Sequence, residues 1–196
     1  MTFIYLHGFN SHRNPNSDKL KELGKVGEVI TLSYDSFAPY EDILENLKEK
    51  IKKELRDRLP GEVALVGTSL GAYWAAVLSG IYGVPAILLN PAIQPAKTLQ
   101  KYVGLTLKNF VSDEVNTLSE DVPKSYPEIS KKGKLLIILD EGDEVLDTYE
   151  TQKLFAEFNP ILFKDGSHRF VHMPEALPHI EKFLSGNITI GFGSDD

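Results

Sequence analysis

The pentapeptide Gly67-Thr68-Ser69-Leu70-Gly71 has the residue types and spacing of a serine nucleophile held in a tight turn. It directly follows the apolar run Val63–Val66 and directly precedes a helix-forming segment. Gly67 and Gly71 would let strand and helix pass closely, and the helix N-terminus would stabilise a developing oxyanion. A Gly/Ser-rich turn that only caps a helix is the alternative. The position between a strand and a helix favours Ser69 as a nucleophile.

A serine nucleophile needs a general base, usually a histidine oriented by a carboxylate. Three histidines follow Ser69 in the chain: His168, His172 and His179. His168 lies in a turn-rich loop directly after the apolar run Ile161–Phe163, so it would stand at the sheet edge where Ser69 also lies. His172 adjoins the last predicted helix and His179 falls within it. We therefore predict His168 as the base.

Five carboxylates lie within Asp140–Asp147, directly after another apolar run. Their spacing does not match a calcium loop, which needs glycine at the sixth and glutamate at the twelfth position of its pattern, so we expect no metal site. Asp143 follows the turn residue Gly142 and is the favoured partner of His168. Asp147 resembles a helix N-cap and Asp140 is close to the strand, but spacing alone leaves the choice among the three open.

An oxyanion needs two backbone donors, and the N–H of Leu70 would supply one of them. The turn His7-Gly8-Phe9 follows the first predicted strand, where a glycine lets the backbone approach the site. We predict that the N–H of Phe9 supplies the second donor. An ordinary strand-to-loop turn is the alternative.

Six short runs rich in Val, Ile, Leu and Phe predict strands, and their nearly continuous apolar character is typical of strands covered on both faces. Amphipathic segments between them predict helices. Strands that alternate with helices predict an α/β fold, with a doubly wound, mostly parallel sheet of about six strands. The strand runs are Phe3–Leu6, Val29–Leu32, Val63–Val66, Ala86–Leu89, Leu135–Leu139 and Ile161–Phe163, and the helices are expected at about Tyr40–Leu59, after Ser69, at about Asp147–Phe158 and at about Pro174–Leu184.

The length of 196 residues predicts one domain, which we place at residues 1–185. Residues 103–133 interrupt the alternation of strands and helices, are polar and carry two prolines. We expect this segment to be a partly helical insertion or lid. Residues 186–196 are expected to be a C-terminal tail, in which Asn187–Ile190 could add an edge strand.

Composition excludes several classes of protein. The chain has 21 Lys+Arg and 28 Asp+Glu, and the resulting net charge of −7 argues against a nucleic-acid or anionic-membrane partner. The absence of cysteine excludes a thiol nucleophile, a disulfide framework and a thiolate zinc site. No apolar run reaches the roughly 18 residues of a membrane span, and the N-terminus lacks a signal-peptide pattern, so we expect a cytoplasmic protein.

Five sequence blocks resemble, in order, the α/β-hydrolase superfamily and more narrowly the small bacterial YqiA-type esterase family. The resemblance reaches to about Leu184 and implies a minimal α/β-hydrolase fold and a serine esterase whose acid is Asp143. Gln94 departs from the family, which tends to carry an arginine there. The resemblance therefore does not imply recognition of an anionic group at that position. Ser167 stands in a block that usually reads Gly-Gly-Asn-His, which changes the surroundings of the base. The blocks are Tyr5–Ser11, Val66–Tyr73, Leu89–Ala92, Gly142–Asp147 and Gly166–Phe170.

These residues predict a hydrolase of short-chain carboxylic esters that acts on a small-molecule ester without cofactor or metal. Ser69 would attack the acyl carbonyl, His168 would take its proton, and Asp143 would orient His168. An acyl thioesterase or a small amide or peptide hydrolase would use the same triad, and a non-catalytic binding protein could retain the fold. Candidate pocket walls are residues 103–133 and four aromatic residues that fit the core equally well: Phe9, Tyr34, Phe37 and Tyr73.

Overall fold

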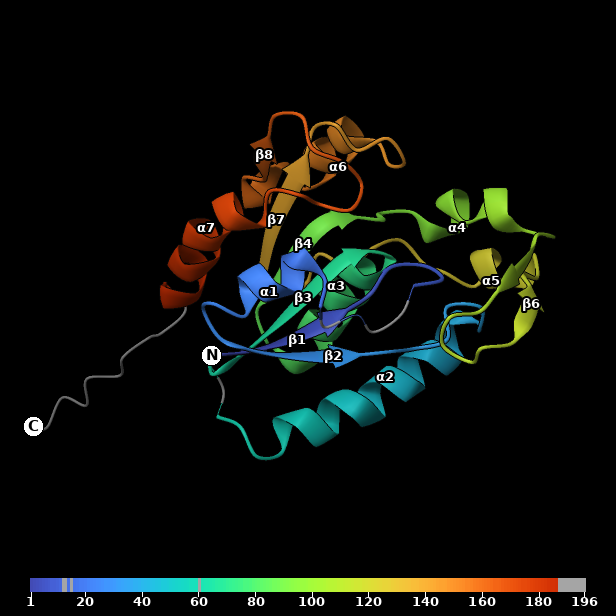
Figure 1. Cartoon of the computed structure of the whole chain (residues 1–196), viewed down its shortest axis with the longest axis horizontal. Coiled ribbons are helices and arrows are strands. Elements are labelled where there is room, and N and C mark those ends of the chain that lie inside the picture. The colour runs from blue at the N-terminus through green and yellow to red at the C-terminus, as the bar shows by residue number, and fades with distance from the viewer. Residues whose placement is uncertain (12–13, 15, 60, 187–196) are drawn as a thin grey trace, which may run out of the picture.

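A computed structural model describes residues 1–11, 14, 16–59 and 61–186 of the chain (Figure 1). Its centre is a six-stranded sheet of order β2-β1-β3-β4-β7-β8, in which each pair of neighbours is parallel. The α/β fold class and the six predicted strands are confirmed. The strands are β1 Thr2–Leu6, β2 Glu28–Leu32, β3 Val63–Ser69, β4 Ala86–Pro91, β7 Leu135–Asp140 and β8 Ile161–Phe163.

Helices cover both faces of the sheet because successive strand residues point to opposite faces. In β1, Ile4 and Leu6 join the core that includes α2 (Tyr40–Leu55) and α3 (Leu70–Tyr82). Phe3 and Tyr5 join the other core, with α1 (Asp18–Leu23) and α7 (Met173–Ser185). Figure 1 shows α2 running below the sheet and α7 along its far left edge. The arrangement is doubly wound, as predicted.

The predicted helix at Tyr40–Leu59 is shorter in the structure, since α2 ends at Leu55. Ile43, Leu47 and Ile51 are buried along its inner face, whereas Leu59 is 67% exposed. The last predicted turn therefore has no core contact to stabilise it, and the prediction of its end was wrong.

The segment predicted as a helix at about Asp147–Phe158 divides into two elements. Helix α6 spans Thr148–Leu154, and a 3-10 turn spans Ala156–Phe158. Asp147 is the N-cap of α6, since its side chain accepts a hydrogen bond of 2.9 Å from the N–H of Glu150.

Residues 95–133 form a separate layer at one end of the sheet, on the right of Figure 1. They begin with helix α4 (Pro95–Thr98) and a 3-10 turn at Gln100–Tyr102. The larger element of residues 103–133 is an antiparallel hairpin, which the sequence did not predict. Its strands are β5 (Thr106–Lys108) and β6 (Val115–Thr117), and the short helix α5 (Asp121–Lys124) follows.

The strand order reverses between β1 and β3, because β2 lies on one side of β1 and the later strands lie on the other. In open α/β sheets, ligands bind outside the carboxyl ends of the strands at such a point. Among the described residues, none of the helices has the length and apolar character that a membrane crossing needs. The predicted edge strand Asn187–Ile190 lies outside the described residues.

Candidate active site

Ser69 occupies a sharp turn between β3 and α3. Its backbone angles are φ 58° and ψ −122°, a conformation that a non-glycine residue keeps only when its surroundings enforce it. A Cβ on Gly67 would collide with the backbone of Gly71, and a Cβ on Gly71 would collide with the carbonyl oxygen of Leu6. Both glycines are therefore required for α3 to pass so close to β1 and β3.

The structure brings the three predicted side chains together in one hydrogen-bonded chain. His168 Nε2 lies 3.0 Å from Ser69 Oγ, and His168 Nδ1 lies 3.0 and 2.9 Å from the two carboxylate oxygens of Asp143. A carboxylate accepts hydrogen bonds, so Nδ1 carries the donated proton and Nε2 can accept the hydroxyl proton of Ser69. The side chain of Asp143 is only 2% exposed and that of His168 is 20% exposed.

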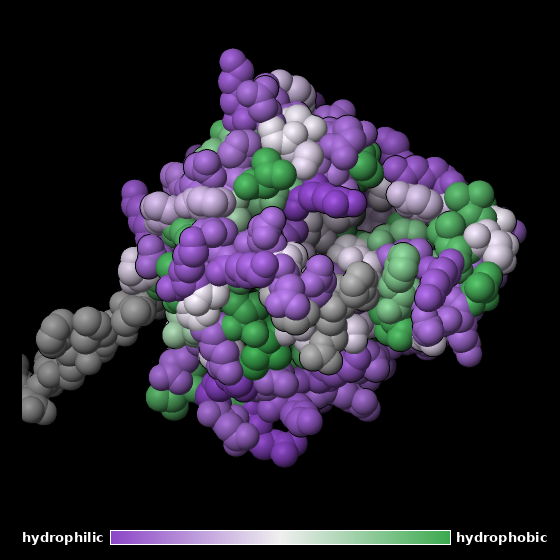
Figure 2. Space-filling view, viewed as in Figure 1, coloured by the Kyte–Doolittle hydropathy of each residue, from purple (hydrophilic) through white to green (hydrophobic). Residues whose placement is uncertain are grey.

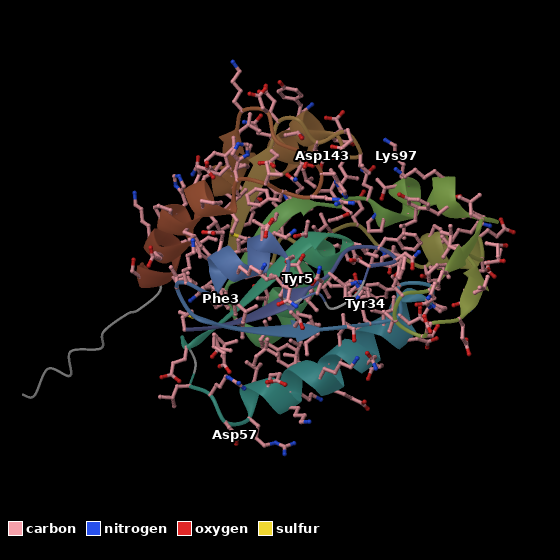
Figure 3. All side chains as sticks on the ribbon, viewed as in Figure 1. Phe3, Tyr5, Tyr34, Asp57, Lys97 and Asp143 are labelled. Carbon is pink, nitrogen blue, oxygen red and sulfur yellow. The ribbon has the colours of Figure 1, made fainter. Side chains whose placement is uncertain are left out.

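Asp143 is held by the loop between β7 and α6 (Figure 3). Its Oδ1 accepts from the N–H groups of Val145 and Leu146 at 2.8 and 2.9 Å. These bonds orient the carboxylate before it meets the imidazole. Among the three aspartates left open by spacing, Asp143 is the one that contacts His168, and Asp147 caps α6.

Glu144 holds the backbone of the base from outside. Its carboxylate accepts from the N–H of His168 at 2.9 Å, and this hydrogen bond lowers the pKa of Glu144 from its usual value. The side chain of Glu144 is exposed, so this contact ties the two loops together at the surface.

The sequence reasoning missed a second His–Asp pair, formed by His172 and Asp140. The Asp140 side chain is fully buried, and its Oδ1 lies 2.7 Å from His172 Nδ1. Its Oδ2 accepts from the N–H groups of Ser167 and Val171 at 3.2 and 3.0 Å. The loop that carries His168 is therefore folded around Asp140. A carboxylate directly at the end of a buried strand was the signal that could have identified it.

Asn90, at the end of β4, joins the same network. Its Nδ2 donates to the carbonyl of Ser167 at 2.9 Å, and its Oδ1 accepts from the N–H of Asp140 at 2.8 Å. The side chain is buried and the backbone has a positive φ of 44°, which asparagine tolerates better than most residues. Asn90 thus positions the loop of His168 from the neighbouring strand.

The two predicted oxyanion donors, the N–H groups of Phe9 and Leu70, both belong to residues that line the cavity beside Ser69. Within the described part of the chain, neither N–H donates to another backbone or side-chain group. A Cβ on Gly8 would lie 3.4 Å from Ser69 Cβ, an ordinary contact, so Gly8 is less constrained than the elbow glycines. His7 Nδ1 donates to the carbonyl of Gly8 at 2.8 Å, which fixes this turn.

A cavity of about 700 Å³ opens at Ser69, and Figure 2 shows the surface hollowed to the right of its centre. Of the aromatic residues predicted as pocket walls, Phe9 lines it. Tyr34 and Tyr73 are buried in the core instead, and Phe37 packs against Phe9 with ring centres 5.4 Å apart. No residue of 103–133 is among the cavity's described lining residues. Its apolar and aromatic lining is formed by Tyr5, Phe9, Leu70, Ala92, Leu99, Tyr102, Val145, Leu146 and Val171.

Comparisons with known proteins are consistent with this architecture. The profile of the uncharacterised protein family UPF0227 matches residues 2–185. A UPF0227 protein of Shewanella sp. strain MR-7 is 28% identical over 195 residues, covering 93% of this chain and 99% of the relative.

Two solved esterase structures share the fold. Est1E from Butyrivibrio proteoclasticus has a TM-score of 0.71 at 14% identity, covering 94% of this chain and 87% of its own. The Pyrococcus furiosus esterase Pf2001 has a TM-score of 0.58 at 16% identity, covering 94% and 81%. At these identities the likeness shows that the chain shares the fold of these structures.

Proposed function

The chain belongs to the uncharacterised protein family UPF0227, and we propose that it is a serine hydrolase that cleaves short-chain carboxylic esters. The observation that supports this most strongly is the continuous hydrogen-bonded chain from Ser69 through His168 to Asp143, with contacts of 2.9–3.0 Å. A serine hydroxyl is a weak nucleophile by itself and is activated by an adjacent base. The strained turn at Ser69 exposes that hydroxyl to the cavity.

In the first half of the reaction, Ser69 Oγ attacks the acyl carbonyl carbon while His168 Nε2 takes the hydroxyl proton. Asp143 keeps the other imidazole proton on Nδ1 and stabilises the imidazolium that forms. The N–H groups of Phe9 and Leu70 donate to the oxyanion of the tetrahedral intermediate. Collapse of the intermediate breaks the bond to the alcohol oxygen, which receives the proton from His168.

In the second half, water attacks the acyl-serine while His168 takes one of its protons. The tetrahedral intermediate then collapses to the free acid, and His168 returns the proton to Ser69 Oγ. Every proton in this cycle passes through His168, so the reaction requires neither a metal nor a redox cofactor.

Hydrolysis of 4-nitrophenyl butyrate by purified Ser69→Ala tests this proposal. Loss of a triad nucleophile costs on the order of 10⁴–10⁶-fold in kcat, so the variant should keep only a small residual rate. Ser112→Ala, which removes an exposed hydroxyl from the loop of the β5–β6 hairpin, is the matched control and should retain the activity. A Ser69→Ala protein that folds and keeps more than a tenth of the rate would exclude the proposed nucleophile.

Ester specificity is tested by holding the acyl group constant. Butyrate is offered as its 4-nitrophenyl ester, as a thioester and as an anilide, and kcat/KM is measured for each. The proposal expects the ester to be hydrolysed fastest. A higher kcat/KM for the thioester or the anilide would reassign the enzyme to one of these classes while keeping the triad.

A further inference from the structure

The cavity beside Ser69 is lined by positive charge in a protein of net charge −7. Three cationic residues line it: Lys19, Lys101 and Arg169. Asp18 is the only acidic residue among its described lining, and its side chain is 102% exposed and 3.9 Å from Lys21. Among the described lining residues, positive charges therefore outnumber negative ones.

Lys19 is fixed in place by neutral groups. Its Nζ donates to Thr68 Oγ1 at 2.8 Å and to the carbonyl of Arg169 at 2.9 Å, and it lies 5.6 Å from the ring centre of Tyr5. No carboxylate among residues 1–11, 14, 16–59 and 61–186 forms an ion pair with Lys19 or with Arg169. An ammonium group has three N–H donors, so one donor and the whole charge remain for a ligand.

The two residues that hold Lys19 are the chain neighbours of the proposed nucleophile and base. Thr68 precedes Ser69, and Arg169 follows His168. The ammonium group is thus anchored beside both groups that would act on the ester.

Two of the cations and part of the apolar lining come from opposite faces of the sheet, whereas Lys101 lies 5.1 Å from the ring centre of Tyr102. Phe9, Leu99 and Tyr102 pack with the core under α2 and α3, and the rings of Phe9 and Tyr102 stack at 4.8 Å. Lys19 belongs to α1, and Arg169 immediately precedes Phe170, which packs with α1 and α7 in the other core. Ser69 is the last residue of β3 and lies at the carboxyl end of the sheet between the two cores. Figure 3 shows Tyr5 beside α1, the helix that carries Lys19.

We propose that the substrate is an ester with an anionic group, a carboxylate or a phosphate, bound by Lys19 and Arg169. The apolar arm of the ester lies toward Leu99 and Tyr102, and the charged arm lies toward α1. This inference rests on the proposed esterase function and names its substrate class. Hydrogen bonds between charged groups are shorter and stronger than neutral ones, so they discriminate well between a charged ester and its neutral analogue.

The test compares pairs of esters that differ only in charge. For the acyl arm, the pair is 4-nitrophenyl hydrogen adipate and its methyl ester. For the alcohol arm, the pair is 5-acetoxy-2-nitrobenzoate and its methyl ester. The wild-type protein should show a higher kcat/KM for the anion in one of the two pairs, and the preference should weaken at high salt. Inhibition by phenyl phosphate and by benzoate at equal concentration distinguishes a phosphate from a carboxylate preference.

Lys19→Met and Arg169→Gln should each lower the ratio of kcat/KM for the anionic ester to that for the neutral ester about 10- to 100-fold, mainly through KM. Lys53→Gln is the matched control, because Lys53 is exposed on α2, on the other side of the molecule, and both esters should react as in the wild type. Arg169 is exposed, so its variant is expected to fold even if Lys19→Met does not.

Several results would overturn the inference. One is a wild-type protein with no preference for the anion in either pair. Another is that, in both variants, the ratio of kcat/KM for the anionic ester to that for the neutral ester stays within twofold of the wild type. An equal loss of kcat for both esters would show that Lys19 only positions its neighbours. If neither the anionic nor the neutral ester of either pair is hydrolysed, the proposed function itself fails, which is a distinct outcome.

Discussion

Replacing Asp140 by alanine removes three hydrogen bonds at once from the loop that carries His168. The carboxylate of Asp140 accepts from the N–H groups of Ser167 and Val171 and from His172, at 3.2, 3.0 and 2.7 Å. The side chain is fully buried, so water cannot replace these bonds without entering the fold. We therefore expect Asp140→Ala to lower both the stability and the activity.

The size of the effect follows from the contacts. A hydrogen bond to a charged group contributes about 1.5–3 kcal/mol, but three bonds to one carboxylate are not additive. Removing one partner of a buried pair costs about 3–5 kcal/mol, which we take as the expected loss of unfolding free energy. For a domain of this size 1 kcal/mol shifts Tm by about 2–4 °C, so Tm should fall by about 6–20 °C. A displacement of the base by about 1 Å would lower kcat on the order of 10²-fold.

Urea denaturation and ester hydrolysis well below Tm measure the two effects separately. Asp147→Ala is the matched control, because loss of the N-cap of α6 should cost about 1 kcal/mol and leave kcat nearly unchanged. Asp140→Asn should be intermediate, since an amide oxygen can still accept from two N–H groups. The reasoning is wrong if Asp140→Ala unfolds within 1 kcal/mol of the wild type and hydrolyses the ester within twofold of its rate.

Two further predictions concern the packing around the site and the core. Gly71→Ala should fail to fold or melt far below the wild type, because the new Cβ would overlap the carbonyl of a strand residue. Gly8→Ala should melt within a few degrees of the wild type. Thermal melts that rank the two variants the other way would contradict this prediction. Burial raises the pKa of the phenols of Tyr34, Tyr73 and Tyr126, so these three should ionise only when the protein unfolds in a spectrophotometric titration at 295 nm. The folded pKa values exceed the unfolded value of about 10, so these tyrosines do not lower the stability of the fold below that pH. As the pH rises above about 10, ionisation of the unfolded chain lowers the free energy of unfolding. Full ionisation of all tyrosines in the folded protein would contradict this prediction.

The meeting of Ser69, His168 and Asp143 was predictable because each residue closely follows an apolar strand run. Parallel strands end at one edge of a sheet, so local patterns were enough to place the three in the same region. The choice between Asp143 and its neighbours needed the loop geometry, in particular the bonds from Val145 and Leu146 that turn its carboxylate toward the imidazole.

Lys19 could not be found from the sequence. Helix α1 has only 6 residues, which is too short to show a helical period. Its contacts with Thr68 and Arg169 join positions 49 and 150 residues apart. Contacts between such distant positions depend on the tertiary fold and leave no local pattern.

The pair of Asp140 and His172 and the β5–β6 hairpin were missed for different physical reasons. Asp140 reads locally as the last residue of a strand, and its role appears only when the loop turns back at Gly166, whose φ is 85°. A Cβ at Gly166 would collide with the carboxylate of Asp140. The hairpin strands have 3 residues each and are largely exposed, so they show no apolar run.

Covalent labelling by a fluorophosphonate probe tests the central claim most directly, since it requires a serine activated by its surroundings and does not depend on knowing the substrate. Peptide mass spectrometry after labelling should locate one adduct, on Ser69, in the native protein. The adduct should be absent from Ser69→Ala and from heat-denatured protein, and it should form much more slowly in His168→Ala. A native protein that takes no label, or one labelled equally well after denaturation, would contradict the account.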